Sequence, residues 1–189
     1  MEPAFAPSYG SVAHELHIAR QHLYDLVSPL SQDELRWIPP RPDGVCVSYH
    51  FGHIALVEDL QIATASDQQP LAPSTFRDLF GPHNANNGQA AFPSGAEIIG
   101  YMQRVRERTL AQLALGFRAI RDTAGAVEAA EPFRGLINHE YSHTKYIRRI
   151  CAEMNHPPVD APASTLIVVD ESAIAAPQYR IDHWVSEPS

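Results

Sequence analysis

Two histidines, His139 and His143, stand one helical turn apart in a stretch whose spacing is typical of a buried helix face. Leu136, Tyr146 and Ile150 share this face, because the five positions step by three, four, three and four residues. Side chains at positions i and i+4 of a helix project in the same direction, so the two imidazole rings can converge. Converging neutral imidazoles suit a divalent metal ion. The alternative interpretation is a pair of core histidines hydrogen-bonded to neighbouring side chains.

A third histidine, His53, lies on a predicted helix over 48–65, where it shares a helical face with Val57 and Leu60. This spacing predicts that His53 faces the core near the start of its helix. His50 lies one turn earlier and could compete with His53 as a ligand. Three imidazoles from two helices leave coordination positions open for water or substrate, which is typical of a catalytic metal site.

Four amphipathic stretches can position these histidines. They predict helices over 11–28, 48–65, 94–117 and 132–155, with short helical turns at 31–37 and 76–80. The predicted helix starts rest on Ser11 and Ser48 as N-caps, on capping boxes formed by Ser31 with Glu34 and by Ser94 with Glu97, and on Pro132 in a first turn. Four such helices joined by connections of unequal length indicate an all-α fold, an antiparallel four-helix bundle.

The chain is expected to be a single domain over 1–189, with the bundle at about 10–156 and a tail at 157–189. Within the tail, 165–169 is β-branched and apolar, and 178–185 alternates partly. We therefore expect an ordered, extended tail that could form short strands. The polar connection over 66–93 is long for a compact domain and could fold over the mouth of a pocket.

Composition excludes several classes of function. The 189-residue chain has a formal net charge of −8, which argues against a nucleic-acid surface because such a surface needs clustered Lys and Arg. No segment reaches the apolar length of a membrane span, and the N-terminus lacks the features of a signal peptide. Two cysteines give no disulfide framework. We therefore expect a cytoplasmic protein.

Two segments together resemble a known family. The first comprises 35–40 (Leu-Arg-Trp-Ile-Pro-Pro) and 48–59, which lead into and form the second predicted helix. The second is 137–143 (Ile-Asn-His-Glu-Tyr-Ser-His) on the last helix. In this order, they resemble the DinB-like (DinB/YfiT-like) metal-binding four-helix bundles, and the resemblance covers roughly 10–156.

The resemblance implies a three-histidine site made of His53, His139 and His143, holding a divalent ion such as zinc or nickel. It departs from the family at Thr144-Lys145-Tyr146, where many members carry a short Arg/Gly/Gln-like run. This departure leaves the implied ligands intact and bears on the chemistry of the pocket. The resemblance and the apolar tail also suggest a homodimer.

Three function classes remain open. Some family members are thiol S-transferases or isomerases that use a low-molecular-weight thiol, so the resemblance implies a metal-dependent transferase acting on a small molecule. A metal-dependent hydrolase of a small molecule is the second class. The third is a non-catalytic metal- or ligand-binding module of a stress response. Because a fold does not determine a reaction, the sequence does not separate these classes.

Three further residues lie near the predicted ligands in the sequence, and each has more than one possible role. Glu58 and Glu140 could act as general bases, but both lie off the face of the neighbouring histidines. We therefore expect them on the surface or in contact with a ligating histidine. Tyr146 shares the ligand face and is expected to be a core aromatic residue.

Overall fold

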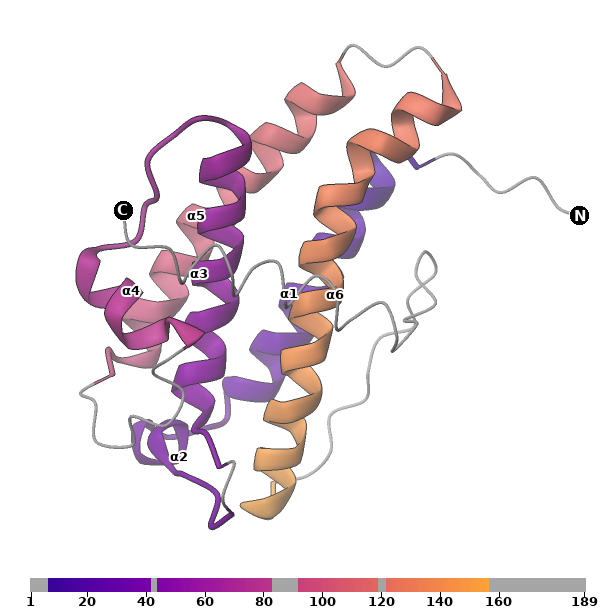
Figure 1. The fold of residues 1–189 in the computed structure, drawn as a ribbon. Helices are drawn as coiled ribbons and strands as arrows, with labels where there is room; N and C mark the ends of the chain where they lie inside the picture. Colours follow the sequence, from indigo (N-terminus) through magenta and orange to yellow (C-terminus); the bar gives the residue numbers. More distant parts are fainter. Residues whose placement is uncertain (1–6, 42–43, 83–91, 119–121, 157–189) are drawn as a thin grey trace, which may run out of the picture.

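The computed structural model describes residues 7–41, 44–82, 92–118 and 122–156, and over these ranges the chain is helical with no strand (Figure 1). The helices are α1 (Tyr9–Val27), α2 (Gln32–Arg36), α3 (Val47–Ala65), α4 (Ser74–Phe80), α5 (Gly95–Phe117) and α6 (Thr123–Glu153). The all-helical prediction is confirmed for these residues. The predicted strands of the tail lie outside the described residues.

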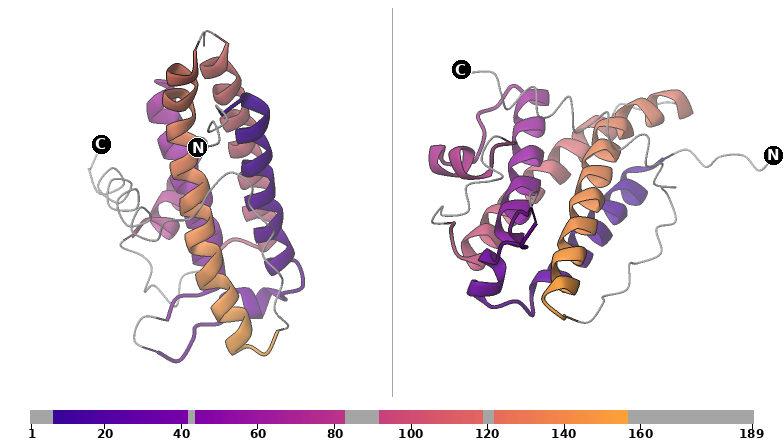
Figure 2. Two further views of the ribbon diagram at one scale, coloured as in Figure 1. Left: turned by 90° about the vertical axis from the view of Figure 1, so that its right-hand side faces the viewer. Right: turned by 60° about the horizontal axis from the view of Figure 1, so that its bottom comes forward.

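The four long helices pack against one another along their lengths (Figure 2). The closest pairs are α1 with α6 and α3 with α5, and α3 also packs against α6. The two short helices, α2 and α4, both contact α3. As a result α3 lies among the other elements, and most of its side chains are buried. No helix among the described residues is long and apolar enough to cross a membrane.

Two of the predicted capping boxes are confirmed. Ser94 is the N-cap of α5, and its hydroxyl accepts from the backbone N–H of Glu97. The carboxylate of Glu97 in turn accepts from the backbone N–H of Ser94. Ser31 and Glu34 form the same arrangement at α2. Each box satisfies backbone donors that a helix start leaves without intrahelical partners. The predicted turn at 76–80 is also confirmed, as part of α4.

Two predicted N-caps are wrong by a few residues. The N-cap of α1 is Ser8, and Ser11 is instead its reciprocal partner three residues into the helix. The N-cap of α3 is Cys46, which makes no side-chain capping bond, and Ser48 is fully buried inside the helix. Since the start of α3 is packed in the core, burial compensates for the missing cap.

The predicted start of α6 is also wrong, because the helix begins at Thr123 and Pro132 lies inside it. Asp122 is the N-cap, and its carboxylate accepts from the backbone N–H of Gly125 at 2.8 Å. The segment 124–130 contains four alanines, whose helix propensity favours this extension. Pro132 carries no N–H and cannot make the interior hydrogen bond, but the neighbouring bonds hold the helix.

The apolar core forms two clusters along the four long helices. One contains Leu23, Phe51 and Ile147, and the other contains Leu16 and Ile62. On each long helix, a charged residue that is buried or largely buried falls between the residues of the two clusters. We call these four residues the charged layer: Arg20, Glu58, Arg106 and Glu140.

Candidate metal centre

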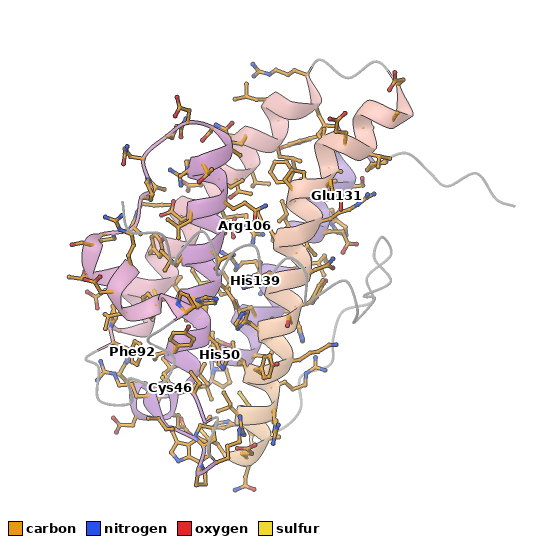
Figure 3. All side chains as sticks on the ribbon, in the orientation of Figure 1. Cys46, His50, Phe92, Arg106, Glu131 and His139 are labelled. Atoms are coloured by element: carbon orange, nitrogen blue, oxygen red, sulfur yellow. The ribbon has the colours of Figure 1, made fainter. Side chains whose placement is uncertain are left out.

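Three buried histidines converge between α3 and α6. His53 comes from α3, and His139 and His143 come from successive turns of α6. Each ring offers one nitrogen, and these nitrogens all lie within 4.8 Å of one another. Figure 3 shows His139 on α6 across from His50 on α3, in the layer between the two helices. This is the set that the sequence predicts, and three imidazoles at this spacing could hold one metal ion.

The proton of His53 is placed by a backbone carbonyl. Nδ1 of His53 lies 2.7 Å from the carbonyl oxygen of Phe80, at the end of α4. A carbonyl oxygen only accepts, so Nδ1 carries the hydrogen and donates it. In a neutral ring this places the lone pair on Nε2, the nitrogen that could ligate a metal ion. The ring of Tyr49 stacks on His53 at 5.4 Å between centroids, which further restricts its orientation.

The end of α4 is held against α3 by close packing at Gly52. A Cβ at Gly52 would lie 2.3 Å from the ring of Phe80, so this ring occupies space that only a glycine leaves. The hydroxyl of Tyr49 donates to the carbonyl of Gly81 at 3.1 Å and secures the same corner. Gly52 and Tyr49 thus position the carbonyl that orients His53.

His50 lies beside the three-histidine set and is hydrogen-bonded to it. Its Nδ1 is 2.9 Å from Nδ1 of His143. The ring of Tyr146 stacks on His50 with an interplanar angle of 1° and 5.6 Å between centroids. Tyr146 is 48% exposed, so the expectation of a core aromatic residue is wrong. It lies at the outer edge of the histidine cluster, where its ring covers His50.

Burial favours the neutral form of three histidines of the cluster, His50, His139 and His143. Burial lowers the pKa of His139 and of His143 well below the usual range, and the neighbouring histidines lower it further. Burial, followed by the charge of His53 and then of Arg41, lowers the pKa of His50 to about 3. Only the neutral imidazole has a lone pair to give, so these shifts favour metal binding at neutral pH.

Glu58 and Glu140 are neither surface residues nor free bases. Arg20 donates to Glu58 at 2.7 Å and to Glu140 at 2.5 Å. Arg106 donates to the same two carboxylates at 2.8 and 2.7 Å. The hydroxyl of Thr109 also donates to Glu58, at 2.7 Å. All four charges of the layer are therefore paired. Of the two positions expected for these carboxylates, on the surface or in contact with a ligating histidine, the surface is excluded by their burial.

The electrostatics of the charged layer follow from these pairs. Burial alone would raise the pKa of Glu58, but the charges of Arg106 and Arg20 outweigh burial and lower it. Glu58 in turn favours the protonated form of His139, although burial of that ring has the larger effect. The layer therefore adjoins the histidine cluster, and in the view of Figure 3 Arg106 lies above His139.

The remaining histidines divide by exposure. His14 and His17 are exposed on α1, where the structure does not bring them to the cluster. His22 is 3% exposed, and its Nε2 accepts from the guanidinium of Arg148 at 2.7 Å. His83 in the polar connection lies outside the described residues. The role of His22 could not be read from spacing, because its partner stands 126 residues away.

A comparison with known families agrees with the site. The family model described as the DinB superfamily matches residues 15–147, a range that includes the histidines contributed by α3 and α6. No curated protein sequence matches the chain. The family match covers well over half of the 189 residues and spans the whole histidine cluster. The chain therefore belongs to the DinB superfamily.

Proposed function

We propose that this protein binds one divalent metal ion through His53, His139 and His143 and acts as a metal-dependent enzyme on a small molecule. The observation that carries the proposal is the convergence of three buried imidazoles, whose nitrogens lie within 4.8 Å of one another. The hydrogen bond from His53 to Phe80 supports it, because it places the ring hydrogen on Nδ1 and the lone pair on Nε2, the nitrogen that could ligate a metal ion. Neutral imidazoles suit both zinc and nickel.

We further propose that the four long helices form the antiparallel four-helix bundle that the sequence predicts. In such a bundle, inward-facing side chains of different helices build a metal site on the axis. The contacts of α3 with both α5 and α6 support this arrangement. Two helices then supply the three ligands, and the remaining coordination positions face substrate or water.

The reaction class that we propose is transfer of a low-molecular-weight thiol to an electrophilic small molecule. In that reaction the thiol sulfur forms a bond to the electrophile, the leaving group departs with its electron pair, and the thiol proton passes to solvent. A divalent ion bound here would supply a Lewis acid that lowers the pKa of a thiol. The family resemblance motivates the thiol, and the open coordination positions of a three-ligand site have room for it.

The residues of this chain would have distinct roles in that reaction. His53, His139 and His143 would hold the ion, and all three rings are buried. Tyr146, at the outer edge of the cluster, could contact a bound substrate. Neither Glu58 nor Glu140 serves as a general base, since each is paired with two arginines.

The test is calorimetric titration of zinc and of nickel into metal-free protein. Wild type should bind one ion, and His53→Ala and His143→Ala should each lose tight binding. His17→Ala is the matched control, because it removes an exposed histidine of α1 and should bind like wild type. If wild type binds neither metal, the cluster is a hydrogen-bonded set of core histidines and the enzyme proposal fails.

A second experiment distinguishes the reaction classes. Cobalt(II)-loaded protein titrated with N-acetylcysteine should gain sulfur-to-metal charge-transfer absorption if a thiol binds at an open position. A hydrolase would show no such band, and its activity would not depend on the thiol. A closed coordination sphere that admits neither thiol nor water would favour the non-catalytic module.

A further inference from the structure

The contact between His50 and His143 requires a hydrogen bond between the two rings. Their Nδ1 atoms are 2.9 Å apart, and both rings are buried. Two lone pairs repel at this distance, so one nitrogen must carry a hydrogen and the other must accept it. Each neutral ring has only one N–H, so this hydrogen bond couples the tautomers of the two rings.

Two arrangements satisfy the contact. In one, His50 donates from Nδ1 and His143 accepts, which places the hydrogen of His143 on Nε2. In the other, His143 donates from Nδ1 and keeps its lone pair on Nε2. The Nδ1 of His143 is committed to His50 in both cases, so only Nε2 can reach a metal ion. The second arrangement is therefore the one that is competent to bind metal.

We propose that His50 is a positioning residue of the metal centre, whose Nδ1 accepts from Nδ1–H of His143 and so presents Nε2 of His143 to the ion. This inference rests on the proposed function, because it assigns a role toward the same ion. His50 itself is not a ligand, since its Nδ1 faces His143, and the three nitrogens that converge belong to the other rings. The proton of His50 then resides on Nε2.

The same device occurs at His53, which supports the assignment. There the Nδ1–H donates to the carbonyl of Phe80 at 2.7 Å, which places the lone pair on Nε2. Histidines from opposite sides of the site would thus each use Nδ1–H to bind a fixed acceptor. One acceptor is a backbone carbonyl and the other an imidazole. Such outer partners orient ligating histidines and raise their basicity.

Aromatic contacts hold the acceptor in place. Tyr146 stacks nearly parallel on His50, and the ring of Tyr49 meets it edge-on at 5.8 Å. His50 lies in the first turn of α3, and its backbone N–H donates to the carbonyl of Cys46 at 3.4 Å. With the ring plane and the backbone both fixed, Nδ1 of His50 stays directed at His143.

Two substitutions separate the acceptor from the aromatic ring. His50→Asn keeps an acceptor, because the amide Oδ1 can occupy the place of Nδ1, but it loses the ring. His50→Phe keeps a ring that can stack on Tyr146 but cannot accept. His17→Phe is the matched control, since it makes the same exchange at an exposed position of α1. Zinc affinity is measured for each by competition with a chromogenic chelator.

We expect His50→Phe to bind zinc about 10- to 100-fold more weakly, the usual loss when an outer partner of a ligating histidine is removed. His50→Asn and His17→Phe should stay close to the wild-type affinity. The metal-free unfolding temperature of His50→Phe should remain near that of wild type, which separates lost ligation from lost folding. If His50→Phe binds zinc as well as wild type does, or if His50→Asn weakens as much as His50→Phe, the inference is overturned.

Wild-type protein gives an independent reading, through long-range ¹H–¹⁵N correlation of the zinc-loaded histidine rings. The expected pattern has His143 protonated on Nδ1 and His50 protonated on Nε2. A zinc-shifted nitrogen on His50 would make it a ligand and overturn the inference while leaving metal binding intact. Failure of wild type to bind zinc would instead overturn the proposed function, so the two failures are distinguishable.

Discussion

Nδ1 of His53 donates to the backbone carbonyl of Phe80 at 2.7 Å, across 27 residues of sequence. This bond joins α3 to the end of α4 and determines which nitrogen of His53 carries the hydrogen. A short helix that contributes no ligand thereby takes part in building the candidate metal centre.

Gly52→Ala should disturb this bond and weaken metal binding. The new Cβ would lie 2.3 Å from the ring of Phe80, and that ring is itself packed against Phe76 and Phe92. We expect a loss of about 1–3 kcal/mol in the free energy of unfolding, the usual cost of overpacking. Urea denaturation measures the loss, and zinc titration measures the weaker binding.

Gly135→Ala is the control for that substitution. Gly135 lies inside α6, and an added Cβ there meets nothing within 4 Å. Alanine in a helix interior should stabilise the protein by about 0.5–1 kcal/mol. Equal effects of the two substitutions would show that contact with Phe80 is not what Gly52 provides.

Neutralising one member of the charged layer should destabilise the fold strongly. Glu140→Gln leaves Arg20 and Arg106 with one charged partner in place of two, and all of these groups are largely buried. Removing one partner of a buried ion pair costs about 3–5 kcal/mol. Chemical denaturation gives the change. Glu131→Gln, which removes a largely exposed partner of Arg134, should leave stability nearly unchanged.

The metal-free protein should lose stability as the pH falls below the ordinary histidine pKa. His139 and His143 have pKa values lowered mainly by burial, and that of His50 is lowered to about 3. Below about pH 6.5 these histidines are protonated in the unfolded chain but remain neutral in the folded protein. Because the unfolded state binds more protons, lowering the pH favours unfolding. Each such histidine contributes a slope approaching about 1.4 kcal/mol per pH unit.

Urea midpoints measured between pH 7.5 and pH 5 check this slope. His143→Gln removes one of the depressed groups and should flatten the dependence. A midpoint that rises on acidification across this interval would contradict the neutral, buried state of the cluster.

Zinc should raise the unfolding temperature, because the ligands are assembled only in the folded state. At a free zinc concentration a thousand times the dissociation constant, the gain is about 4.1 kcal/mol. Differential scanning calorimetry with zinc, and again after chelation, measures it. The gain should shrink toward pH 5, since protonated imidazole cannot bind. His53→Ala should show no zinc-dependent shift.

The homodimer that the sequence suggests stays a prediction. Static light scattering of the full chain at working concentration should give twice the mass of one 189-residue chain. A monomeric mass across a tenfold range of concentration would contradict it.

The inward direction of the three candidate ligands could be read from the sequence because helical periodicity is a local property. His139 and His143 stand one turn apart among apolar neighbours, and His53 shares a face with core residues, so their direction follows from spacing. The capping box of Ser94 and Glu97 was equally readable, since both partners lie within one turn.

The tertiary structure decided what lies opposite each of these faces. Helical spacing placed Glu58 and Glu140 away from the faces that carry the histidines. Only the packing of α1 and α5 brings Arg20 and Arg106 into contact with these carboxylates. These ion pairs offset the free-energy cost of burying the two carboxylates. Tyr146 follows the apolar spacing and is nevertheless half-exposed.

The sequence also could not predict which groups accept hydrogen bonds from the histidine rings. The carbonyl of Phe80 and the ring of His50 lie 27 and 93 residues from their partners, His53 and His143. Periodicity reports the direction of a side chain from its own helix and carries no information on what another element presents to it. The sequence by itself therefore determined which imidazoles face inward. The tertiary structure decided which nitrogen of His53 carries the hydrogen, because that depends on an acceptor brought in by another helix.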